Sequence, residues 1–596
     1  AEFQKPLESL KAEVDKQYTN QYLYAFSGLW QQALEPMAEW KSGVLGSQAK
    51  FFDRHVAPVI KDGRTKVVVI VSDGMRYEVA EELASMIRSE NRFDAAIQKF
   101  QAALGTEQVL FSAEHLAPYT KVMMSVESAK HTPSAVLTAT SVEQVQAVVK
   151  ICNEYRIPVW TISTGRNFGY GSAAPVERGQ IVLDLKKMNK ILHVDPELCT
   201  ALVEPGVTYQ DLYDYIEERQ LPLMLSFSAP SAIAGPLGNT MDRGVGYTPY
   251  GEHFLMQCGM EVVLANGDLY RTGMGGVKGD NAWQVFKWGY GPTLDGMFTQ
   301  ANYGICTKMG FWLMPKPPVF KPFEIKFDNE SDIAEIVEFI RPLRIAQVIP
   351  NSVVIAGVLW EASTCNTRRA DYTSEPGATS EAILKQIQKD KNLGAWNVYA
   401  ALYGTQEQVD VNWKIVSGAL KQLGKGRLVT QEEAGDTQPF KYRAQLMSGV
   451  PNLQEFGLYN WRGGGGSMWF APVSQARGSE CEKQQALAKK ILNKHGLDYV
   501  GEFIVGWRDM HHVIDVLYDR SNPEETQRAN ACFAELLDVF EEAGYAVYRV
   551  NTAFQDRVAQ SYGPVKRKLE HTLKRALDPN NILAPGKSGI DLANPF

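Results

Sequence analysis

The chain has 596 residues, of which 45% are hydrophobic and 22% charged, enough to bury substantial cores in roughly two to four domains. Its net charge of -7 provides no basic field, so we expect neither nucleic acid nor an anionic membrane as a partner. No run of about 18 apolar residues occurs and the first residues lack an apolar signal core, so we predict neither a membrane span nor a secretory leader.

Signatures of metal and hydrolytic sites are missing. The seven cysteines are scattered, odd in number and never spaced CxxC, which argues against a disulfide framework or zinc cage and predicts buried thiols. The nine histidines form no HExxH motif, and the adjacent His511 and His512 cannot both face one metal from regular structure. Ser467 is preceded by glycines but followed by Met468 and Trp469, so the GxSxG motif of serine hydrolases is absent.

Residues 1–93 have a character of their own. After a helix-like, Gln- and Lys-rich start, the apolar run at 66–71 leads through Asp73 into an amphipathic pattern, which predicts a strand, a loop and a helix. This piece resembles the start of the core of PglZ-type proteins of the alkaline phosphatase superfamily, where the aspartate would be a metal ligand. The resemblance ends near residue 93 and the other ligands of such a site are missing. We therefore expect a non-catalytic α/β fragment, either a natural fusion or an artefact.

A longer α+β body begins near residue 94. Ser141 and Gln144 have the spacing of a capping box at the start of a helix, whose buried face is predicted to contain Val142, Val145, Val148, Val149 and Cys152. A buried strand, IPVWTIS, then leads into the loop STGRNFGYG at 163–171. Its glycines and small hydroxyls can direct backbone N–H groups and side-chain donors at a pyrophosphate. By itself this loop fits an ordinary glycine-rich turn equally well.

Further along the chain, strand patterns alternate with a second glycine-rich loop. QIVLDL and TALVEPGVT read as strands, and a helix is expected around Leu212, Tyr215 and Ile216. The polar segment at 238–254, GNTMDRGVGYTPYGEHF, precedes EVVLANGDLYRTG. In the latter, Asn266 and Gly267 separate two apolar runs and predict a β-hairpin.

Near the middle of the second half, Tyr459 stands beside four consecutive glycines in EFGLYNWRGGGG. Glycine allows positive φ and close backbone approach, so the run can lie against a large flat ligand, with Tyr459 as its nearest polar group. A flexible surface turn preceded by a core tyrosine is the alternative that these residues alone leave open.

Several long motifs together carry a family resemblance over about residues 95–596. They are ISTGRNFGYGSAAP, GNTMDRGVGYTPYGEHF, EFGLYNWRGGGGSMWFAPV, DMHHVIDVLYDR and RVAQSYGPVKRKLE. The chain resembles the vanillyl-alcohol oxidase family of flavoproteins, and within it the branch of 4-cresol dehydrogenases (hydroxylating). The resemblance implies an α+β fold of the vanillyl-alcohol oxidase type. A two-subdomain FAD-binding domain would cover 94–315, an α+β cap domain 316–550, and a carboxyl-terminal segment returning to the FAD domain 551–596.

The resemblance also implies the cofactor site. The FAD pyrophosphate would be held by two loops, through Ser163, Thr164, Gly165, Arg166, Asn167 and Gly169 from the first and Gly238, Asn239 and Gly246 from the second. In the cresol-oxidising branch a tyrosine at the position of Tyr459 carries the flavin covalently. Because a phenol is a weak nucleophile unless its anion is stabilised, Arg462 or another cation would assist the attachment.

The same resemblance implies oxidation of 4-alkylphenols such as 4-cresol, through a quinone methide that adds water to give 4-hydroxybenzyl alcohol and then 4-hydroxybenzaldehyde. Tyr170, Tyr548 and Arg549 would stabilise the substrate phenolate, and Arg549 would instead or also stabilise the reduced flavin. Glu502 with His511 would form the base for water, with Glu455 nearer the flavin. Lys587 stands where the resemblance leads us to expect an arginine. A lysine ammonium is a point charge without the bidentate hydrogen-bonding geometry of a guanidinium, so its hold on a phenolate or flavin oxygen would be looser or reoriented.

Electron disposal separates the nearest alternatives. A tyrosine linkage favours transfer to a c-type cytochrome subunit, and because the chain has no CxxCH motif the heme c would belong to that partner. A flavoprotein homodimer and a bacterial periplasmic location are expected from the same resemblance, the latter without a leader to support it. Trp469 would line the pocket or the electron path, unless it is simply aromatic core. A eugenol or vanillyl-alcohol type oxidase, and a phosphatase-like or protein-interaction role of residues 1–93, remain the other hypotheses.

Overall fold

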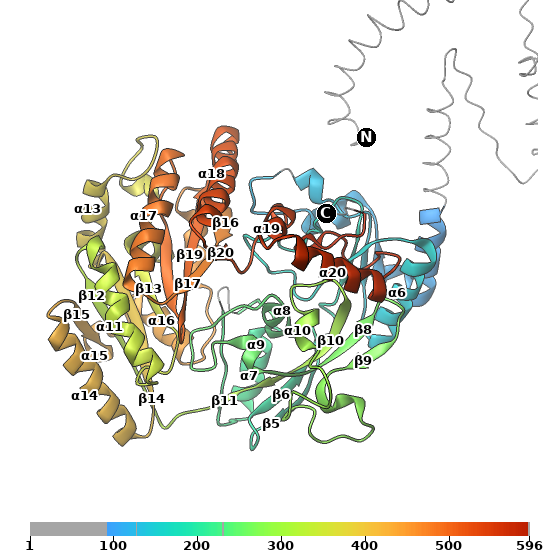
Figure 1. Ribbon diagram of the computed structural model, residues 1–596, viewed down its shortest axis with the longest axis horizontal. Coiled ribbons are helices and arrows are strands. Elements are labelled where there is room, and N and C mark those ends of the chain that lie inside the picture. Colours follow the sequence, from blue (N-terminus) through green and yellow to red (C-terminus); the bar gives the residue numbers. More distant parts are fainter. Residues whose placement is uncertain (1–91, 127, 229–231, 594–596) are drawn as a thin grey trace, which may run out of the picture. The chain divides into compact units, whose positions relative to one another are not determined.

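The computed structural model describes residues 92–126, 128–228 and 232–593 (Figure 1). The strand, loop and helix predicted before residue 92, with Asp73, lie outside the described residues. Residues Arg92–Phe596 form one compact unit, in which helices and mixed sheets confirm the α+β class.

The first layer is a four-stranded sheet of order β1-β2-β4-β3. Its strands are β1 (Val109–Leu110), β2 (Val136–Thr138), β3 (Val159–Ile162) and β4 (Ile181–Asp184), and only β1 is antiparallel to its neighbour. A helix at 92–104, α5 (Ala113–Leu116) and α6 (Val142–Tyr155) belong to the same part of the chain. The parallel strands β2, β4 and β3 are buried almost throughout, as expected for a sheet covered on both faces.

Helix α6 confirms most of its sequence prediction. The Ser141 hydroxyl accepts a hydrogen bond from the Gln144 backbone N–H, which caps the first turn. The Gln144 carboxamide accepts from the Thr140 backbone N–H rather than from that of Ser141, so the second half of the capping box falls one residue earlier. Val145, Val148, Val149 and Cys152 are buried, and Val142 is half-buried at the edge of the core.

The second layer is an antiparallel five-stranded sheet of order β5-β6-β10-β8-β9. Its strands are β5 (Ile191–Asp195), β6 (Thr200–Val203), β8 (Gln257–Leu264), β9 (Leu269–Arg271) and β10 (Gly304–Trp312). The hairpin predicted at Asn266-Gly267 joins β8 to β9, with Gly267 at φ 86° and the Asn266 side chain accepting from the Asp268 N–H. The helices of this region are α7 (Tyr209–Glu218), α8 (Pro236–Met241), α9 (His253–Met256) and α10 (Asp295–Phe298), and β7 (Leu223–Met224) pairs with β11 (Met314–Pro315).

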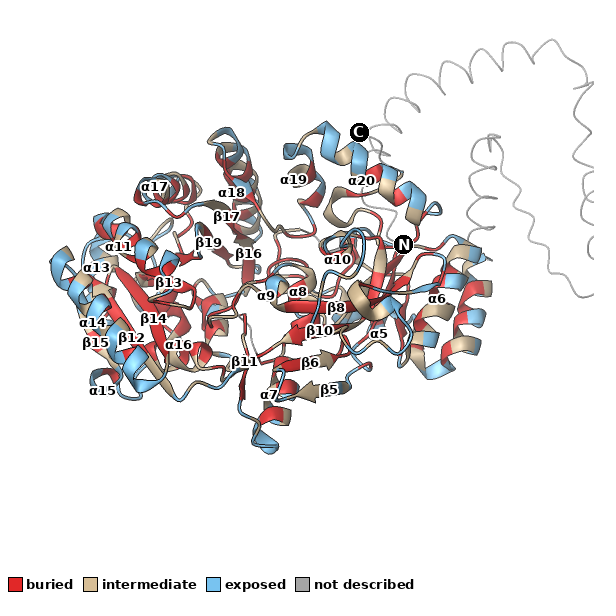
Figure 2. Cartoon of the chain, turned by 60° about the horizontal axis from the view of Figure 1, so that its bottom comes forward, coloured by how far each residue is buried: buried red, intermediate tan, exposed pale blue. Residues whose placement is uncertain are grey.

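The third layer is an antiparallel sheet that runs β15-β12-β14-β13-β18-β19-β17-β20, with β16 also paired to β19. Its strands are β12 (Val319–Phe327), β13 (Val353–Gly357), β14 (Trp396–Gly404), β15 (Arg427–Thr430), β16 (Gly466–Phe470), β17 (Pro472–Gln475), β18 (Gly501–Val505), β19 (Asp509–Tyr518) and β20 (Ala546–Val547). The helices between them are α11 (Ile333–Ile345), α12 (Val358–Thr364), α13 (Glu381–Lys391), α14 (Gln406–Leu423), α15 (Gln431–Ala434), α16 (Phe440–Met447), α17 (Gly478–Lys494) and α18 (Pro523–Glu542). Figure 2 shows the buried strands of this sheet flanked by helices whose outer faces are exposed.

The end of the chain returns to the first two layers. After β20 it forms α19 (Gln555–Ser561) and α20 (Pro564–Leu577), which lie on the same side of Figure 1 as α6, β8 and β10. Ile582 and Leu583 pack into the core beneath α6, and Leu583 bridges Val159 of β3 in parallel register. This return places Lys587 beside the loop that follows β3, far from it in sequence.

Two composition-based predictions can be compared with the fold. All seven cysteines are free, and five are buried while Cys199 and Cys365 are only half-buried. Across the described parts of the chain, no helix has both the length and the apolar content to cross a membrane.

Candidate active site

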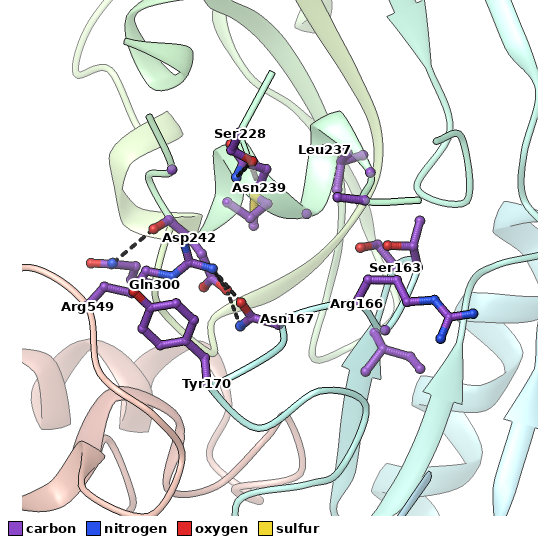
Figure 3. Close-up of a pocket in the computed structure, with 18 of the residues that line it drawn as sticks. Ser163, Arg166, Asn167, Tyr170, Ser228, Leu237, Asn239, Asp242, Gln300 and Arg549 are labelled. Atoms are coloured by element: carbon purple, nitrogen blue, oxygen red, sulfur yellow. Dashed lines mark hydrogen bonds and ion pairs between the residues drawn. The ribbon is translucent and has the colours of Figure 1, made fainter. Parts of the chain in front are cut away.

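A long pocket runs from the loop after β3, past the amino-terminal part of α8, to the inner face of the third sheet. Figure 3 shows its two ends, with Ser163 and Arg166 at one and Tyr170 and Arg549 at the other, while Leu237 and Asn239 of α8 lie between them. The pocket therefore joins the two glycine-rich loops found in the sequence to residues of the carboxyl-terminal half.

The loop end of the pocket has the tight geometry expected for a pyrophosphate cradle. Gly165 has φ 66°, a left-handed conformation that favours glycine, and a Cβ placed on Gly238 would overlap the Ser163 hydroxyl. Gly238 lies in α8, not in a loop as predicted, and α8 approaches the loop after β3 so closely that a side chain at Gly238 would displace the Ser163 hydroxyl. Of the predicted FAD-binding residues, those that line the pocket are Ser163, Thr164, Gly165, Arg166, Asn167, Gly238 and Asn239.

Gly169 and Gly246 were also predicted to meet the pyrophosphate, but neither lines the pocket. A Cβ on Gly169 would overlap the Trp469 indole, and one on Gly246 would overlap the Phe227 carbonyl and the His253 ring. Both glycines are therefore required by protein packing around the site, which a glycine-rich motif by itself does not distinguish from ligand contact.

Four of the residues predicted to act on the substrate meet at the other end. Tyr170, Tyr548, Arg549 and Lys587 all line the pocket, and the Arg549 guanidinium carbon lies 4.2 Å from the centre of the Tyr170 ring. Burial raises the pKa of both tyrosines above 10, so each keeps its proton at neutral pH and can donate it in a hydrogen bond.

Asp242 is a site residue that our sequence analysis missed, although it lies within the motif at 238–254. Its carboxylate is 3.1 Å from Lys587 Nζ and 3.9 Å from Arg549, and it accepts a hydrogen bond of 3.1 Å from the Asn167 side chain. Burial opposes its ionisation, but Lys587, Arg549 and Asn167 outweigh that effect and lower the pKa of Asp242. The pocket end thus holds two cations and one anion, a net positive charge suited to an anionic ligand.

Glu455 and Glu502 line the pocket from the side of the third sheet. Glu502 lies on β18 and accepts a 2.9 Å hydrogen bond from Arg443, whereas neither carboxylate oxygen of the buried Glu455 has a hydrogen-bond partner. Burial is the largest cause that raises the pKa of both groups well above 4.5, while Arg443 opposes it. Both carboxyls therefore titrate closer to neutrality than an exposed glutamate.

The expected pair of Glu502 with His511 does not form. His511 Nε2 lies 3.3 Å from Asp509, its Nδ1 has no hydrogen-bond partner, and its ring stacks on Tyr548 with centroids 4.7 Å apart. In the register of β18 and β19, Glu502 lies opposite Val513 while His511 lies opposite Ile504, which offsets the two side chains along the strands. His511 thus packs against Tyr548 and is not a lining residue.

Tyr459 lies just beyond the pocket wall, in the 3₁₀ helix η10 (Gln454–Asn460). Its ring contacts that of Trp469, which does line the pocket, with centroids 6.5 Å apart. Burial and the nearby Asp515 raise the pKa of Tyr459 far above 10. Asp515 is itself fully buried, accepts a 2.7 Å hydrogen bond from Ser467, and has its pKa raised to about 8 by burial.

Arg462 cannot assist Tyr459 in the way we expected. Its guanidinium pairs with Asp498 at 2.9 Å and Glu525 at 3.1 Å, and donates to the carbonyls of Gly377 and Gly496. These four contacts direct Arg462 into a structural network that anchors the glycine run. The glycines confirm the conformational part of the prediction, since Gly463, Gly464 and Gly465 all have positive φ.

Two family models match most of the part of the chain that forms the pocket. Residues 133–273 match the family model "FAD binding domain", and residues 380–588 match "FAD linked oxidases, C-terminal domain". The chain is 77% identical over 508 residues to the 4-cresol dehydrogenase [hydroxylating] flavoprotein subunit of Pseudomonas putida, covering 85% of this chain and 98% of that protein. The chain therefore belongs to the family of FAD-linked flavoproteins that includes this 4-cresol dehydrogenase subunit.

Solved structures give the same result. A crystal structure of p-cresol methylhydroxylase with substrate bound matches with a TM-score of 0.84 and 77% identity, over 85% of this chain and 98% of that one. A 4-ethylphenol oxidase from Gulosibacter chungangensis, in complex with isoeugenol, matches with a TM-score of 0.81 and 35% identity, over 88% and 99% of the two chains. The family resemblance inferred from the motifs is confirmed, and so is the FAD-binding fold.

The amino-terminal piece has its own match. Residues 51–129 match the model "BREX system PglZ alkaline phosphatase-like domain", which extends beyond the limit near residue 93 that we predicted. In the structure, however, Ala96, Phe100 and Leu104 pack into the core beneath α6, while Val122 and Met124 pack against the third sheet. These described residues of the overlap therefore belong physically to the compact unit Arg92–Phe596.

The pocket itself fits the cofactor of the family. The glycine at position 238 leaves the backbone of α8 open to a pyrophosphate, and the net positive charge around Asp242 suits the electron-rich end of a flavin or an anionic substrate. Arg549 Nε is buried without a partner, as expected of a donor awaiting a ligand.

Proposed function

We propose that this protein is an FAD-dependent 4-cresol dehydrogenase (hydroxylating), which oxidises 4-alkylphenols at the benzylic carbon and adds water there. The observation that carries the proposal is the meeting of Tyr170, Tyr548 and Arg549 at one end of a pocket whose other wall presents Glu455 and Glu502. A phenol ring between these groups would have its oxygen at the cationic end. Its alkyl carbon would face the carboxyls.

Phenolate formation is the first task of the cationic end. Tyr170 and Tyr548 keep their protons because burial raises their pKa, so both can donate hydrogen bonds to the substrate oxygen. Arg549 supplies a permanent charge, held in place by Asn167 and by Asp242 at 3.9 Å. Together these groups lower the pKa of a bound phenol and favour its anion, whose ring electrons assist loss of a hydride from the alkyl carbon.

Bound FAD supplies the hydride acceptor for this oxidation. The chain's residues position it: the loop after β3 and the start of α8 would hold the pyrophosphate, and Lys587 would place a cation near the ring system. Because Lys587 is also 3.1 Å from Asp242, its charge is partly offset, and it acts as a point charge without the bidentate geometry of arginine.

Water addition is the task of the carboxyls. As the water oxygen bonds to the quinone methide carbon, one of its protons passes to a carboxylate of Glu455 or Glu502, and the ring regains its phenolate. A carboxyl with a raised pKa is a stronger base than an ordinary glutamate, which suits it to accept that proton. His511 acts indirectly in this scheme, by supporting Tyr548.

We further propose that Tyr459 carries the flavin covalently through its phenolic oxygen. Its position in η10, with its ring against that of the pocket-lining Trp469, supports this role. The glycines that follow, Gly463 to Gly465, have positive φ and form the turn after η10.

A c-type cytochrome partner that carries heme c, a flavoprotein homodimer and a periplasmic location complete the proposal. The relative from Pseudomonas putida is described as a flavoprotein subunit, which supports a partner subunit for this chain as well. We also retain the division at 94–315, 316–550 and 551–596, because the third sheet begins at β12 and the chain end returns to β3.

Anaerobic mixing of the flavin-loaded protein with 4-cresol tests the function. We expect bleaching of the oxidised flavin, formation of 4-hydroxybenzyl alcohol, and turnover only when an artificial electron acceptor is added. An unreduced flavin would refute the proposal. The 35% identity to a 4-ethylphenol oxidase makes an oxidase of the same family the second candidate, and steady hydrogen peroxide formation in air would favour it.

A further inference from the structure

A buried charge network lies behind the two pocket carboxyls. Arg443 of α16 donates from one terminal nitrogen to Glu361 of α12 at 2.6 Å and to Glu502 of β18 at 2.9 Å. Its Nε donates to the same Glu361 oxygen at 3.1 Å, and its other terminal nitrogen lies 3.9 Å from Glu455. A single guanidinium therefore joins both pocket carboxyls to a third carboxyl outside the pocket.

Glu361 and Arg443 do not line the pocket, whereas Glu455 and Glu502 do. The side chains of Glu361 and Arg443 are 0% and 2% exposed, so no solvent reaches the centre of the network. The second Glu361 oxygen accepts a 3.1 Å hydrogen bond from the Tyr442 hydroxyl, which fixes the carboxylate toward Arg443. Glu361 is thus held by Arg443 at one carboxylate oxygen and by Tyr442 at the other.

The charges of this network do not balance. Three carboxyls share one guanidinium in a buried region, and an unpaired buried carboxylate is strongly disfavoured. Because Glu361 takes two of the three close hydrogen bonds from Arg443, the guanidinium is only partly available to Glu502 and is a distant contact for Glu455. The missing charge is most simply supplied by a proton retained on the Glu455–Glu502 pair.

We propose that Glu361 is a positioning residue that engages Arg443 and so withholds part of the guanidinium from Glu455 and Glu502, which lets this pair take up a proton from water near neutral pH. The inference rests on the proposed function and assigns a role to a residue outside the pocket. Without Glu361, Arg443 would hold the pocket carboxyls as ordinary carboxylates, which are weak bases.

The proton balance of the step is simple. Water loses one proton to the unprotonated member of the pair, its oxygen bonds to the quinone methide carbon, and the phenolate oxygen recovers the negative charge. No oxidant or reductant takes part in this step. The proton then leaves the pair before the next turnover.

Apart from Arg443, the groups that face Glu455 and Glu502 either raise the pKa of these carboxyls or carry no charge. Burial is the largest cause that raises the pKa of Glu502, and Glu455 and Glu361 add to it, while Arg443 opposes all three. Trp360 and the neutral Tyr247 face Glu455. Glu324 is a further buried carboxyl near this network: it accepts a 3.1 Å hydrogen bond from Tyr399 but has no hydrogen bond or ion pair with Arg443.

The test compares Glu361→Gln, Glu361→Asp and Arg443→Lys with Glu324→Gln as the matched control. Flavin bleaching after anaerobic mixing with 4-cresol reports hydride transfer, and rapid quenching with chromatography reports formation of 4-hydroxybenzyl alcohol. Both rates are measured from pH 5 to 10 on protein loaded with FAD.

In Glu361→Gln we expect the pH midpoint of alcohol formation to fall by about one to two units, because one buried negative charge near the pair is removed. Arg443→Lys should move the midpoint upward, since the fork that reaches Glu502 is lost. Glu361→Asp and Glu324→Gln should keep the parental midpoint, and the pH profile of flavin bleaching should stay unchanged throughout.

The pH midpoint is expected to fall in Glu361→Gln and to rise in Arg443→Lys, so either variant tests the proposal if the other does not fold. Parental midpoints in Glu361→Gln or Arg443→Lys, or an equal shift in Glu324→Gln, would overturn the role of Glu361. A parent protein whose flavin is not bleached by 4-cresol would instead overturn the proposed function, so the two failures are distinguishable.

Discussion

Replacing Arg549 by methionine is the most direct test of how the pocket binds its substrate. Methionine keeps a flexible chain of similar length but removes the charge, and the pocket end then holds Lys587 and Asp242 alone, 3.1 Å apart. The net charge around the substrate oxygen falls from about +1 to zero. Arg549→Lys is the control, because it retains the charge while losing the contacts of the guanidinium fork.

The size of the effect follows from the distances. An opposite charge within about 4 to 6 Å lowers the pKa of an acid by roughly 1 to 3 units. Since Asp242 lies 3.9 Å from Arg549 and offsets part of its charge, we expect the lower part of that range. The pKa of a bound phenol should therefore rise by about 1 to 2 units in Arg549→Met, which reduces the phenolate fraction at neutral pH about 10- to 100-fold.

Ultraviolet difference spectra of bound phenol, which has no alkyl group to oxidise, would measure this ionisation directly across pH. Flavin bleaching by 4-cresol should shift toward alkaline pH by the same amount in Arg549→Met and much less in Arg549→Lys. If the bound phenol ionises equally in Arg549→Met and in the parent, phenolate stabilisation by Arg549 is wrong. A change confined to the flavin reduction potential would instead assign Arg549 to the reduced flavin.

Three further predictions concern the cofactor and the core. Tyr459→Phe should release all yellow colour into the supernatant on acid precipitation, and colour retained on the protein would contradict a covalent bond at this residue. Gly238→Ala should weaken FAD binding about tenfold, as measured by titration, because its Cβ would displace the Ser163 hydroxyl that lines the pocket, whereas Gly276→Ala, with open space around its Cβ, should bind FAD as the parent does. Lys574→Met should lower the free energy of unfolding by about 3 to 5 kcal/mol in urea, since it strands the fully buried Asp578 without its cation, and an unchanged midpoint would refute this.

Local pattern was sufficient wherever the interactions are close in sequence. The cap and buried face of α6 follow from hydrogen bonds and spacing within one helix, and the Asn266-Gly267 hairpin follows from a turn that only a few residues can form. The long motifs identified the family, and two of them contain glycines that line the pocket, Gly165 and Gly238.

Contacts between side chains of distant segments could not be predicted from local sequence patterns. His511 and Glu502 lie nine positions apart and share a sheet, but the register of β18 and β19 offsets them along the strands. His511 pairs with Asp509, and Glu502 accepts a hydrogen bond from Arg443. Arg462 lies three residues after Tyr459 but pairs with Asp498. The local sequence does not show which carboxylates the fold brings near this arginine.

The sequence by itself determined the class of fold, the family, the two glycine-rich loops and the tyrosine beside the glycine run, because these depend on local conformation and on motifs that are contiguous in the chain. Only the tertiary structure decided the electrostatics of the site. It placed Asp242 between Lys587 and Arg549, and Glu361 behind Glu502, through contacts that span scores to hundreds of residues. Charge interactions depend on distance and burial in space, and a linear sequence records neither.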